Sequence, residues 1–318
     1  MNLDKITILQ KRAGIIKSIR DFFAKQNVIE VETPLLCSSS VTDPYLHALS
    51  LECGSHTRFL QTSPEYAMKR LLCEGISDIY QICKAFRSDE FGKLHQIEFT
   101  ILEWYRLNFD HHQLMNETEL LLQTVINSPP AKKFTYQELF EQYLKFNPHA
   151  ITQNKLIDQL NQNEISLKET GSLSKDDYLD ILFSQRIEPK LKSDFEPLTP
   201  IFVTEYPASQ AALAKTNLNS EGIEIAERFE VYINGIELAN GYHELQDGNV
   251  QRQRFQQDLE KRKTLNLPLV PIDEYLCTAL DKGLPSCAGI ALGIDRLTML
   301  ALDKHHISDV ISYDFYHS

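Results

Sequence analysis

The sequence lacks the features that mark exported, zinc-stabilised or membrane-spanning proteins. Its 6 cysteines are scattered, with no Cys-x-x-Cys pair and no Cys/His spacing typical of metal ligands, so neither a disulfide framework nor a zinc site is expected. No apolar run reaches membrane-spanning length, and charged residues interrupt residues 1–25. We therefore expect no membrane partner and no signal peptide, and we predict a cytoplasmic protein.

Positive charge is also scarce, with 32 Lys and Arg against 44 Asp and Glu and a formal net charge of −12. This balance repels a phosphate backbone and disfavours a dedicated DNA or RNA binder, although a local basic patch remains open. Repeats and long linkers are absent too, since SPPAKK at 128–133 is too short to separate domains. We predict a single catalytic-type domain over residues 1–318, with a helical insertion at about 111–195.

Hydrophobic periodicity predicts helices and strands in alternation. Apolar residues at steps of three or four from Leu9 to Phe23 predict a first helix, which leads into a strand over VIEVETPLL that Pro34 ends. Ser-Pro at 63–64 opens a second helix, and Gly75 ends it.

The later parts of the chain carry equally clear local signals. Capping boxes that begin at Thr135 and Ser174 predict helix starts in the middle segment. From residue 201 strands return, and Asn234-Gly235 between β-rich flanks predicts a hairpin turn. The run AGIALGIDRLTMLAL changes from period 2 to period 3.6 near Asp295, which predicts a strand that feeds a helix.

The most informative stretch is FRSDEFGKLHQIEFTILEWYR, which reads as strand, loop and strand. Phe99, Glu103 and Tyr105 share one parity and would face the same cavity. Arg87 and His95 flank the loop, so cationic donors would close over a polyphosphate laid across the hairpin. The alternative is a half-buried hairpin with solvated charges at its tip.

The last strand and helix hold small residues and an arginine. Gly289, Ala291 and Gly293 fall on one strand face, which favours either a floor for a ligand or close packing of a helix on the sheet. Arg296 lies among apolar residues and needs a desolvated partner, an open cleft or an ion pair with a carboxylate.

Two acids and an amide follow the predicted hairpin turn within IELANGYHEL. Glu237, Asn240 and Glu244 close to a cavity indicate a bound cation. That cation is Mg²⁺, a substrate ammonium or a lysine from elsewhere in the fold, and the sequence does not choose among them.

The order of these elements resembles that of class II aminoacyl-tRNA synthetases. VETPLL is similar to their motif 1, FRSDE with HQIEFT to motif 2, and GIALGIDRL to motif 3. TSPEY, EFTILEWY and ELANGYHEL resemble the lysyl-tRNA synthetase group in particular. Motif 1 begins about thirty residues from Met1, which leaves no room for an anticodon-binding domain. The chain therefore resembles the elongation factor P beta-lysyltransferase family, which is itself similar to a truncated lysyl-tRNA synthetase.

This resemblance implies an α+β fold of the class II synthetase type, with an antiparallel sheet of about six strands flanked by helices. It also implies a homodimer formed through motif 1, ATP and Mg²⁺ as cofactors, and no tRNA partner. The reaction implied is activation of (R)-beta-lysine or lysine as an adenylate, followed by transfer to the ε-amino group of a lysine on elongation factor P. A free-standing lysyl-adenylate ligase for another acceptor and a non-catalytic regulatory protein of this fold are the alternatives.

Roles for individual residues follow from the same resemblance. Arg87 and Arg296 are expected to be catalytic, and Glu237 to bind Mg²⁺. Nucleotide contacts are expected from Arg87, Ser88, Asp89, His95, Gln96, Phe99, Glu237, Leu238, Gly293 and Arg296. Amino-acid contacts are expected from Ser63, Pro64, Glu65, Glu103, Tyr105, Asn240, Glu244 and Ala291.

The chain departs from the family pattern at three positions, and a fourth distinguishes it from the tRNA-charging enzymes. Asp89, Gln96 and Ile97 replace the usual Glu, Asn and Pro of the nucleotide loop, which weakens the transfer of the Asp89 contact in particular. Ala291 stands where the tRNA-charging enzymes typically have Gly, and one methyl group on a pocket floor is worth ~1–3 kcal/mol in selectivity. Arg87 and Arg296 are intact, so we predict an active enzyme.

Overall fold

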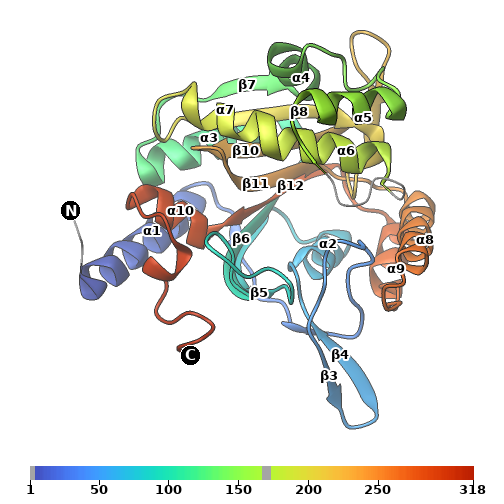
Figure 1. Ribbon diagram of the computed structural model, residues 1–318. Helices are drawn as coiled ribbons and strands as arrows, with labels where there is room; N and C mark the ends of the chain where they lie inside the picture. The colour runs from blue at the N-terminus through green and yellow to red at the C-terminus, as the bar shows by residue number, and fades with distance from the viewer. Residues whose placement is uncertain (1–3, 167–172) are drawn as a thin grey trace. The chain divides into compact units, whose positions relative to one another are not determined.

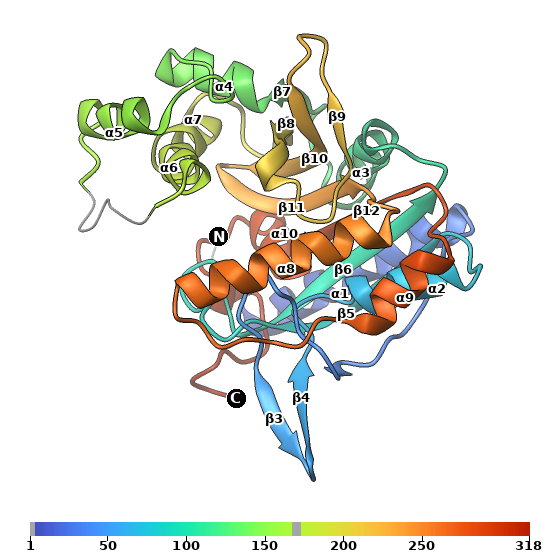
Figure 2. The ribbon, with the colours of Figure 1, turned by 90° about the vertical axis from the view of Figure 1, so that its right-hand side faces the viewer.

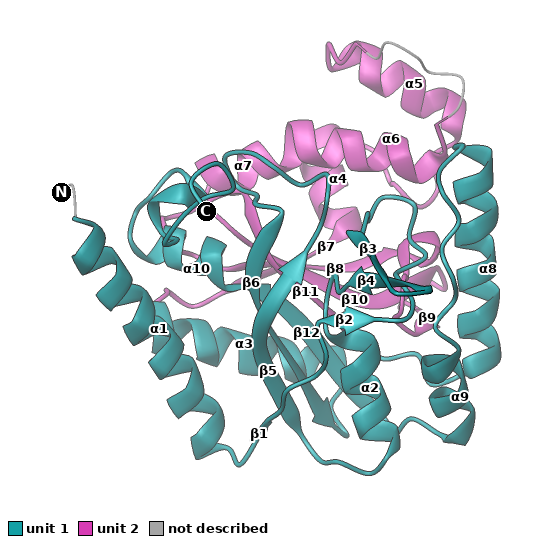
Figure 3. Cartoon of the chain, turned by 90° about the horizontal axis from the view of Figure 1, so that it is seen from below, with its two compact units in different colours: residues 1–127, 243–318 teal, residues 128–242 magenta. Residues whose placement is uncertain are grey.

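The computed structural model describes residues 4–166 and 173–318, which form two compact units (Figure 3). Residues 1–127 and 243–318 make the first unit, and residues 128–242 make the second. The single catalytic domain with an insertion at about 111–195 stays a prediction. Among the described residues, no helix combines the length and the apolar character that a membrane span requires.

The first unit contains two sheets (Figure 1). In the larger one the strands follow the order β1-β5-β6-β12, with β1 parallel to β5 and the other pairs antiparallel. The strands are β1 (Ile29–Glu30), β5 (Ile79–Phe86), β6 (Glu98–Leu107) and β12 (Cys287–Gly293), with β2 (Leu36–Cys37), β4 (His56–Leu60) and β3 (Ser50–Cys53) in the smaller sheet. The helices are α1 (Lys5–Lys25), α2 (Glu65–Cys73), α3 (His111–Ile126), α8 (Gly248–Thr264), α9 (Glu274–Lys282), α10 (Ile294–Ala301) and the 3₁₀ turn η3 (Ile307–Asp309). Figure 2 shows α8 and α9 side by side, and the β3–β4 hairpin projecting from this unit.

The hairpin predicted around the nucleotide loop is present as β5 and β6, and the predicted strand-to-helix change is present as β12 and α10. The strand expected over VIEVETPLL is much shorter than predicted, because β1 pairs with β5 over only two residues. The Val31 N–H still donates to the Tyr80 carbonyl, but next the Thr33 hydroxyl donates to the Gln81 side chain and the backbone ladder ends.

Aromatic packing fixes α1 on the larger sheet of the first unit. Phe23 stacks on Tyr80 at 4.5 Å between ring centroids and meets Trp104 edge-on at 5.4 Å. The fully buried Trp104 ring donates its N–H to Glu117 on α3 at 3.0 Å. The sheet that carries the nucleotide hairpin therefore has a rigid apolar backing.

The second unit contains five further strands and a set of helices. Its strands are β7 (Lys132–Thr135), β8 (Ile201–Pro207), β9 (Thr216–Leu218), β10 (Glu224–Ile233) and β11 (Ile236–His243), in the order β11-β10-β8-β7 with β9 beside β10. Its helices are α4 (Tyr136–Leu144), α5 (Gln153–Gln162), α6 (Lys175–Leu182), the π turn η1 (Phe183–Ile187), α7 (Glu188–Ser193) and the 3₁₀ turn η2 (Ala208–Gln210). Both predicted capping boxes are confirmed, and Asn234 and Gly235 form the predicted turn with φ of +53° and +69°.

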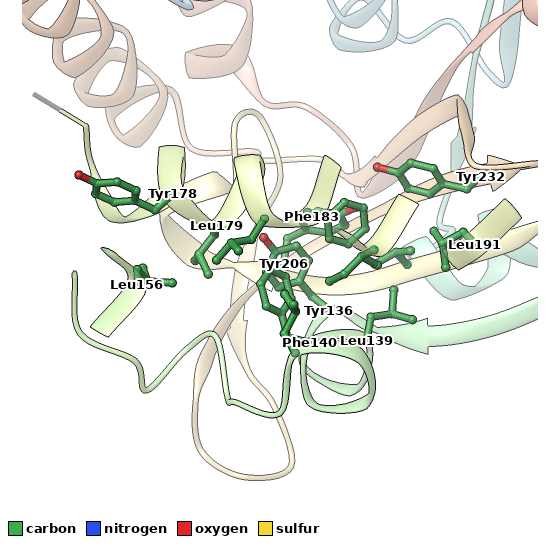
Figure 4. Packing of buried hydrophobic residues seen from close by; sticks show 14 of the residues in the cluster. Tyr136, Leu139, Phe140, Leu156, Tyr178, Leu179, Phe183, Leu191, Tyr206 and Tyr232 are labelled. Atoms are coloured by element: carbon green, nitrogen blue, oxygen red, sulfur yellow. The ribbon is translucent and has the colours of Figure 1, made fainter. Parts of the chain in front are cut away.

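Aromatic and aliphatic residues form the core of the second unit (Figure 4). Tyr136 stacks on Phe183 at 5.4 Å and lies 4.9 Å from the Tyr206 ring. The strand β7 was not expected in a segment predicted to be helical. The mixed α and β composition is as predicted, but the described residues hold more than six strands, four in the larger sheet of the first unit and five in the second unit.

Candidate active site

The antiparallel register of β6 and β12 places small residues opposite polar ones in the first unit. Ala291 pairs with Glu103 and Gly289 pairs with Tyr105. A Cβ atom on Gly289 would lie 2.3 Å from the Tyr105 ring and 2.5 Å from Oε1 of Glu244. Gly289 is therefore required by side chains with predicted roles in amino-acid binding, and the closest of its neighbours do not belong to a packed helix.

Three acids and one lysine meet beside this strand pair. Lys69 Nζ lies 2.6 Å from Oε1 of Glu65 and 2.5 Å from Oε2 of Glu244, and the Lys69 and Glu244 side chains are only 2% and 1% exposed. Burial opposes the charged form of Lys69, but the carboxylates of Glu244 and Glu65 raise its pKa above the ordinary lysine value. From the sequence, the cation beside Glu244 could be Mg²⁺, a substrate ammonium or a lysine. In the structure, Glu244 contacts the ammonium of Lys69.

Glu103 completes this group. We call it the acid cluster, and it consists of Ser63, Glu65, Lys69, Glu103, Tyr105 and Glu244. The Ser63 hydroxyl donates to Oε2 of Glu103 at 2.7 Å, and the Tyr105 hydroxyl donates to Oε1 at 2.6 Å. Burial and then the Glu65 carboxylate raise the pKa of Glu103 to about 8, against the lowering effect of these hydrogen bonds. Burial likewise raises the pKa of Tyr105, which keeps its hydroxyl a donor.

A cavity of about 360 Å³ opens at the amino end of α2, within the range of about 300–1,000 Å³ that small-molecule pockets occupy. It meets the acid cluster through Ser63 and Glu65 and also borders Pro64. The Ser63 hydroxyl accepts the Glu65 N–H at 3.0 Å, so a residue that lies just before α2 contacts both the first residue of the helix and Glu103. Polar lining comes further from Ser39, Arg58, Gln61, Arg70 and Asp273.

The nucleotide loop, residues 87–97, brings the two predicted catalytic arginines to one place. Arg87 Nη1 lies 3.0 Å from Oε1 of Glu90, and the other oxygen of Glu90 lies 3.8 Å from His95 Nε2. His95 Nε2 in turn lies 2.6 Å from Nη2 of Arg296, whose Nε donates to the Leu94 carbonyl at 3.3 Å. An anion and a histidine thus bridge the two guanidinium groups.

His95 accepts rather than donates in this chain of contacts, because an arginine carries only donors. Burial, then the charges of Arg296 and Arg87, lower the pKa of His95, with Glu90 acting in the opposite direction. A neutral His95 with Nε2 as acceptor is therefore the form that fits beside Arg296.

Phe99 lies on β6 under the same loop. The Arg87 guanidinium lies 5.0 Å from the centre of the Phe99 ring, within the range of cation–π contacts. The Phe99 ring and the Arg87 guanidinium are therefore adjacent. This arrangement suits a nucleotide whose adenine stacks on the ring while its phosphate contacts the guanidinium. Gly293 comes at the junction of β12 and α10, three residues before Arg296.

The positions where the chain departs from the family pattern have partners of their own. Asp89 contacts the His47 ring, and the hydrogen bond from His47 holds the pKa of Asp89 below its usual range. Ser88 donates its hydroxyl to Asp89 at 3.1 Å. The buried Gln96 accepts the Phe315 N–H at 3.1 Å, so the longer amide side chain ties the nucleotide loop to residues near the carboxyl end.

Glu237, Leu238 and Asn240 lie on β11 in the second unit, whereas the acid cluster belongs to the first unit. Asn240 accepts from Nε of Arg228 at 3.3 Å, and Arg228 also pairs with Glu230. Leu238 is buried, while Glu237 is partly exposed. Near Asn240, Glu230 also accepts from the Tyr206 and Tyr232 hydroxyls at 2.6 and 2.5 Å.

Sequence reasoning did not single out Lys69, Glu90 or Arg228. Lys69 follows Glu65 by four residues on one helix, a spacing that favours an ion pair and offered a signal. Glu90 follows Arg87 by three residues inside a loop, where spacing alone does not imply contact. Nothing local indicates that Lys69 also reaches Glu244, which lies far along the chain.

Known proteins resemble this chain over nearly its whole length. The profile of the family described as tRNA synthetases class II (D, K and N) matches residues 2–315. The elongation factor P--(R)-beta-lysine ligases of Photobacterium profundum and Vibrio atlanticus are each 46% identical to it, over 96% of this chain and 94% and 95% of their own lengths. The same-named protein of Pectobacterium carotovorum is 45% identical over 96% of this chain and 94% of its own length. The chain belongs to the class II tRNA synthetase family and, within it, to the group that contains these ligases.

Proposed function

We propose that this protein is an ATP-dependent ligase that activates (R)-beta-lysine and transfers it to the ε-amino group of a lysine on elongation factor P. The observation that carries the proposal is the acid cluster, which brings three acidic side chains, Glu65, Glu103 and Glu244, together in a class II synthetase. Carboxylates held out of water pair with ammonium groups and disfavour neutral amino acids, because those would leave the charges unpaired.

In the first step, an oxygen of the substrate carboxylate attacks the α-phosphorus of ATP. A new P–O bond forms, the bond to pyrophosphate breaks, and an aminoacyl-adenylate results. Arg87 and Arg296 would neutralise the negative charge that grows on the phosphate oxygens, while the Phe99 ring would stack on adenine. Their link through Glu90 and His95 in this structure supports a shared role, because it holds the two guanidinium groups at one loop.

In the second step, the ε-amino nitrogen of the acceptor lysine attacks the adenylate carbonyl carbon. The C–N bond forms, the C–O bond to AMP breaks, and the nitrogen loses a proton as the amide forms. Positioning and exclusion of water supply the acceleration, and this chain needs no side-chain nucleophile.

Ala291 would select the beta isomer. Its pairing with Glu103 across β6 and β12 puts the methyl group beside the acid cluster, where it limits the space near the amino group of the substrate. The tRNA-charging relatives would accept the alpha isomer through the larger space left by Gly at this position.

Mg²⁺ would be held by Glu237, whose partly exposed carboxylate suits a metal that is bound by one or two carboxylates plus phosphate oxygens. When bound, Mg²⁺ offsets phosphate charge. Glu244 does not suit this role, since it is buried against the Lys69 ammonium.

We also propose a cytoplasmic homodimer that assembles through α1 and β1. Ile6 and Ile29 in these elements are 70% and 47% exposed, and exposed apolar side chains of this size favour burial against a second copy. Light scattering that gives the mass of one chain would contradict the dimer.

Two measurements test the function. Pyrophosphate exchange with each lysine isomer should be faster with (R)-beta-lysine than with alpha-lysine. Mass spectrometry of elongation factor P after incubation with the protein, ATP and (R)-beta-lysine should show one added lysyl group, and no exchange with either isomer would overturn the proposal.

A further inference from the structure

Lys69 is the cation at the centre of the acid cluster, and no step of the proposed reaction uses it. It projects from α2, is 1% exposed, and contacts one oxygen of Glu65 and one of Glu244. The first of these acids lies on its own helix, whereas the second follows β11 in the sequence and lies next to β12, where its N–H donates to the Cys287 carbonyl. Lys69 therefore joins two separate parts of the first unit.

Removing an ammonium group from water costs several kcal/mol unless its partners are well placed. Lys69 has two such partners, because its Nζ lies 2.6 Å from Oε1 of Glu65 and 2.5 Å from Oε2 of Glu244. These contacts restrict the orientation of both carboxylates, because rotating either of them away from Lys69 breaks an ion pair of the buried ammonium. Both acids are thus held in one orientation before any substrate arrives.

Because the contact with Lys69 fixes the Glu244 carboxylate, it also fixes the position of Oε1, the oxygen that Lys69 does not contact. Lys69 contacts Oε2, while Oε1 lies beside Gly289, where a Cβ atom would come within 2.5 Å of it. Gly289 is also the residue opposite Tyr105, whose hydroxyl contacts Glu103. Oε1 of Glu244 and the Glu103 carboxyl therefore both lie next to the pair of Gly289 and Tyr105 on β12 and β6.

We propose that Lys69 is a positioning residue for amino-acid selection, holding Glu65 and Glu244 so that their other oxygens, together with Glu103, receive the ammonium groups of the substrate. This inference rests on the proposed function and adds a residue that does not itself touch ATP or the reacting carboxylate. Lys69 also sets the charge of the cluster, since its ammonium offsets one of the two carboxylates that it contacts and leaves the group of Glu65, Lys69 and Glu244 with a net negative charge for the ammonium groups of the substrate.

The decisive experiment is a double-mutant cycle with Lys69→Met, Glu65→Gln and both changes together, measured by pyrophosphate exchange. Lys69→Met should raise the KM for the amino acid about 100-fold and leave the KM for ATP within about threefold. The double variant keeps the net charge of the Glu65, Lys69 and Glu244 group at −1, as in the natural chain, so it removes the positioning without adding charge.

The comparison that matters is the double variant against Glu65→Gln alone. If Lys69 positions Glu244, the double variant has an amino-acid KM at least about tenfold above that of Glu65→Gln. If Lys69 only stabilises the fold, the two have the same KM, and the inference is overturned. The double variant also carries the test if Lys69→Met does not fold, which thermal unfolding of each protein reports.

A pH profile adds a readout that a structural role would not change. The Lys69 charge lowers the pKa of Glu103, so without Lys69 the Glu103 carboxyl takes up a proton more readily, and the loss in amino-acid KM should shrink as the pH rises from about 6.5 to 8.5. The titratable groups that face Lys69 are Glu65 and Cys73 on α2, Glu103 on β6, and Glu244. A loss that is constant across this range contradicts the proposal.

Lys263→Met is the matched control, because Lys263 and Glu260 form an i, i+3 pair at 2.5 Å on α8 whose side chains are 51% and 59% exposed. It should leave both KM values unchanged. If the natural chain shows no amino-acid-dependent pyrophosphate exchange, the proposed function itself is refuted. If the natural chain exchanges normally and Lys69→Met has the same amino-acid KM, only the inference about Lys69 is refuted.

Discussion

The Lys69 and Glu244 side chains of the acid cluster are almost completely buried, whereas the Arg87 and Glu90 side chains of the nucleotide loop are 26% and 28% exposed. Both regions hold opposite charges in contact, but only the buried pair is costly to break. The cluster is therefore built in advance for its ligand. The loop instead has contacts that an incoming polyphosphate can exchange, because water solvates the partners that are released.

Arg296→Ala should have the largest effect, since it removes one of the two guanidinium groups at the loop. We expect the exchange rate to fall about 10³-fold with little change in the amino-acid KM. Single-turnover adenylate formation is the appropriate measurement. A rate near that of the natural enzyme would mean that the loop does not stabilise the transferring phosphate.

Glu244→Gln examines the other side of the comparison. The neutral amide leaves Lys69 with one carboxylate in place of two and removes a charge from the cluster, so the amino-acid KM should rise about 100-fold. The ATP KM should change less than threefold. Calorimetric titration with each ligand separates the two effects, and equal losses for both would contradict the division between cluster and loop.

Gly289→Ala sharpens the comparison by adding one methyl group to the buried side. The new Cβ would lie 2.3 Å from the Tyr105 ring, which is packed and not free to move aside. Overpacking of this kind costs about 1–3 kcal/mol. Chemical denaturation should show that loss, while Gly92→Ala in the loop, where no atom lies within 4 Å of a new Cβ, should leave stability unchanged.

Glu103→Gln uses pH to test how strongly the cluster is buried. Because the pKa of Glu103 is raised to about 8, its protonated form stabilises the fold, and this contribution is lost as the pH rises from the ordinary glutamate value to about 8. Glutamine stays neutral, so the stability of the variant relative to the natural chain should rise by about 4 kcal/mol between pH 5 and pH 8.5. A pH-independent difference in melting temperature would show that Glu103 is solvated.

Gln96→Ala should have the smallest effect. It removes the bond to the Phe315 N–H and leaves the contact of Phe91 with Phe315 at 5.9 Å, so the loop is loosened and not lost. We expect the ATP KM to rise about threefold with the amino-acid KM unchanged, as measured by exchange. An effect on the amino acid alone would run against the separation of the two regions.

Much of the site could be predicted from local patterns, because each depends on neighbours in sequence. The register confirms the parity of Glu103 and Tyr105 and the small residues of β12. The second helix is predicted with Ser63 as its cap and Pro64 as its first residue, whereas Pro64 is the N-cap and the helix begins at Glu65. The pair of Lys69 with Glu244 could not be predicted, since a contact between distant residues depends on how the sheet is assembled. The short β1 and the unexpected β7 have the same cause, because a strand exists only where a partner is available.

The unbroken pairing of Cys287–Gly293 with Ile101–Leu107 also bears on how this enzyme can be altered. Deleting a single residue from the middle of β12 would turn the remainder of that strand over, moving Ile290 or Leu292 to the positions beside Glu103 and Tyr105. If Ile290 were the residue deleted, catalysis would stop although every predicted site residue was still encoded. Length changes between 88 and 96 carry no such penalty, so new nucleotide specificities are better sought by remodelling that loop than by editing the strands.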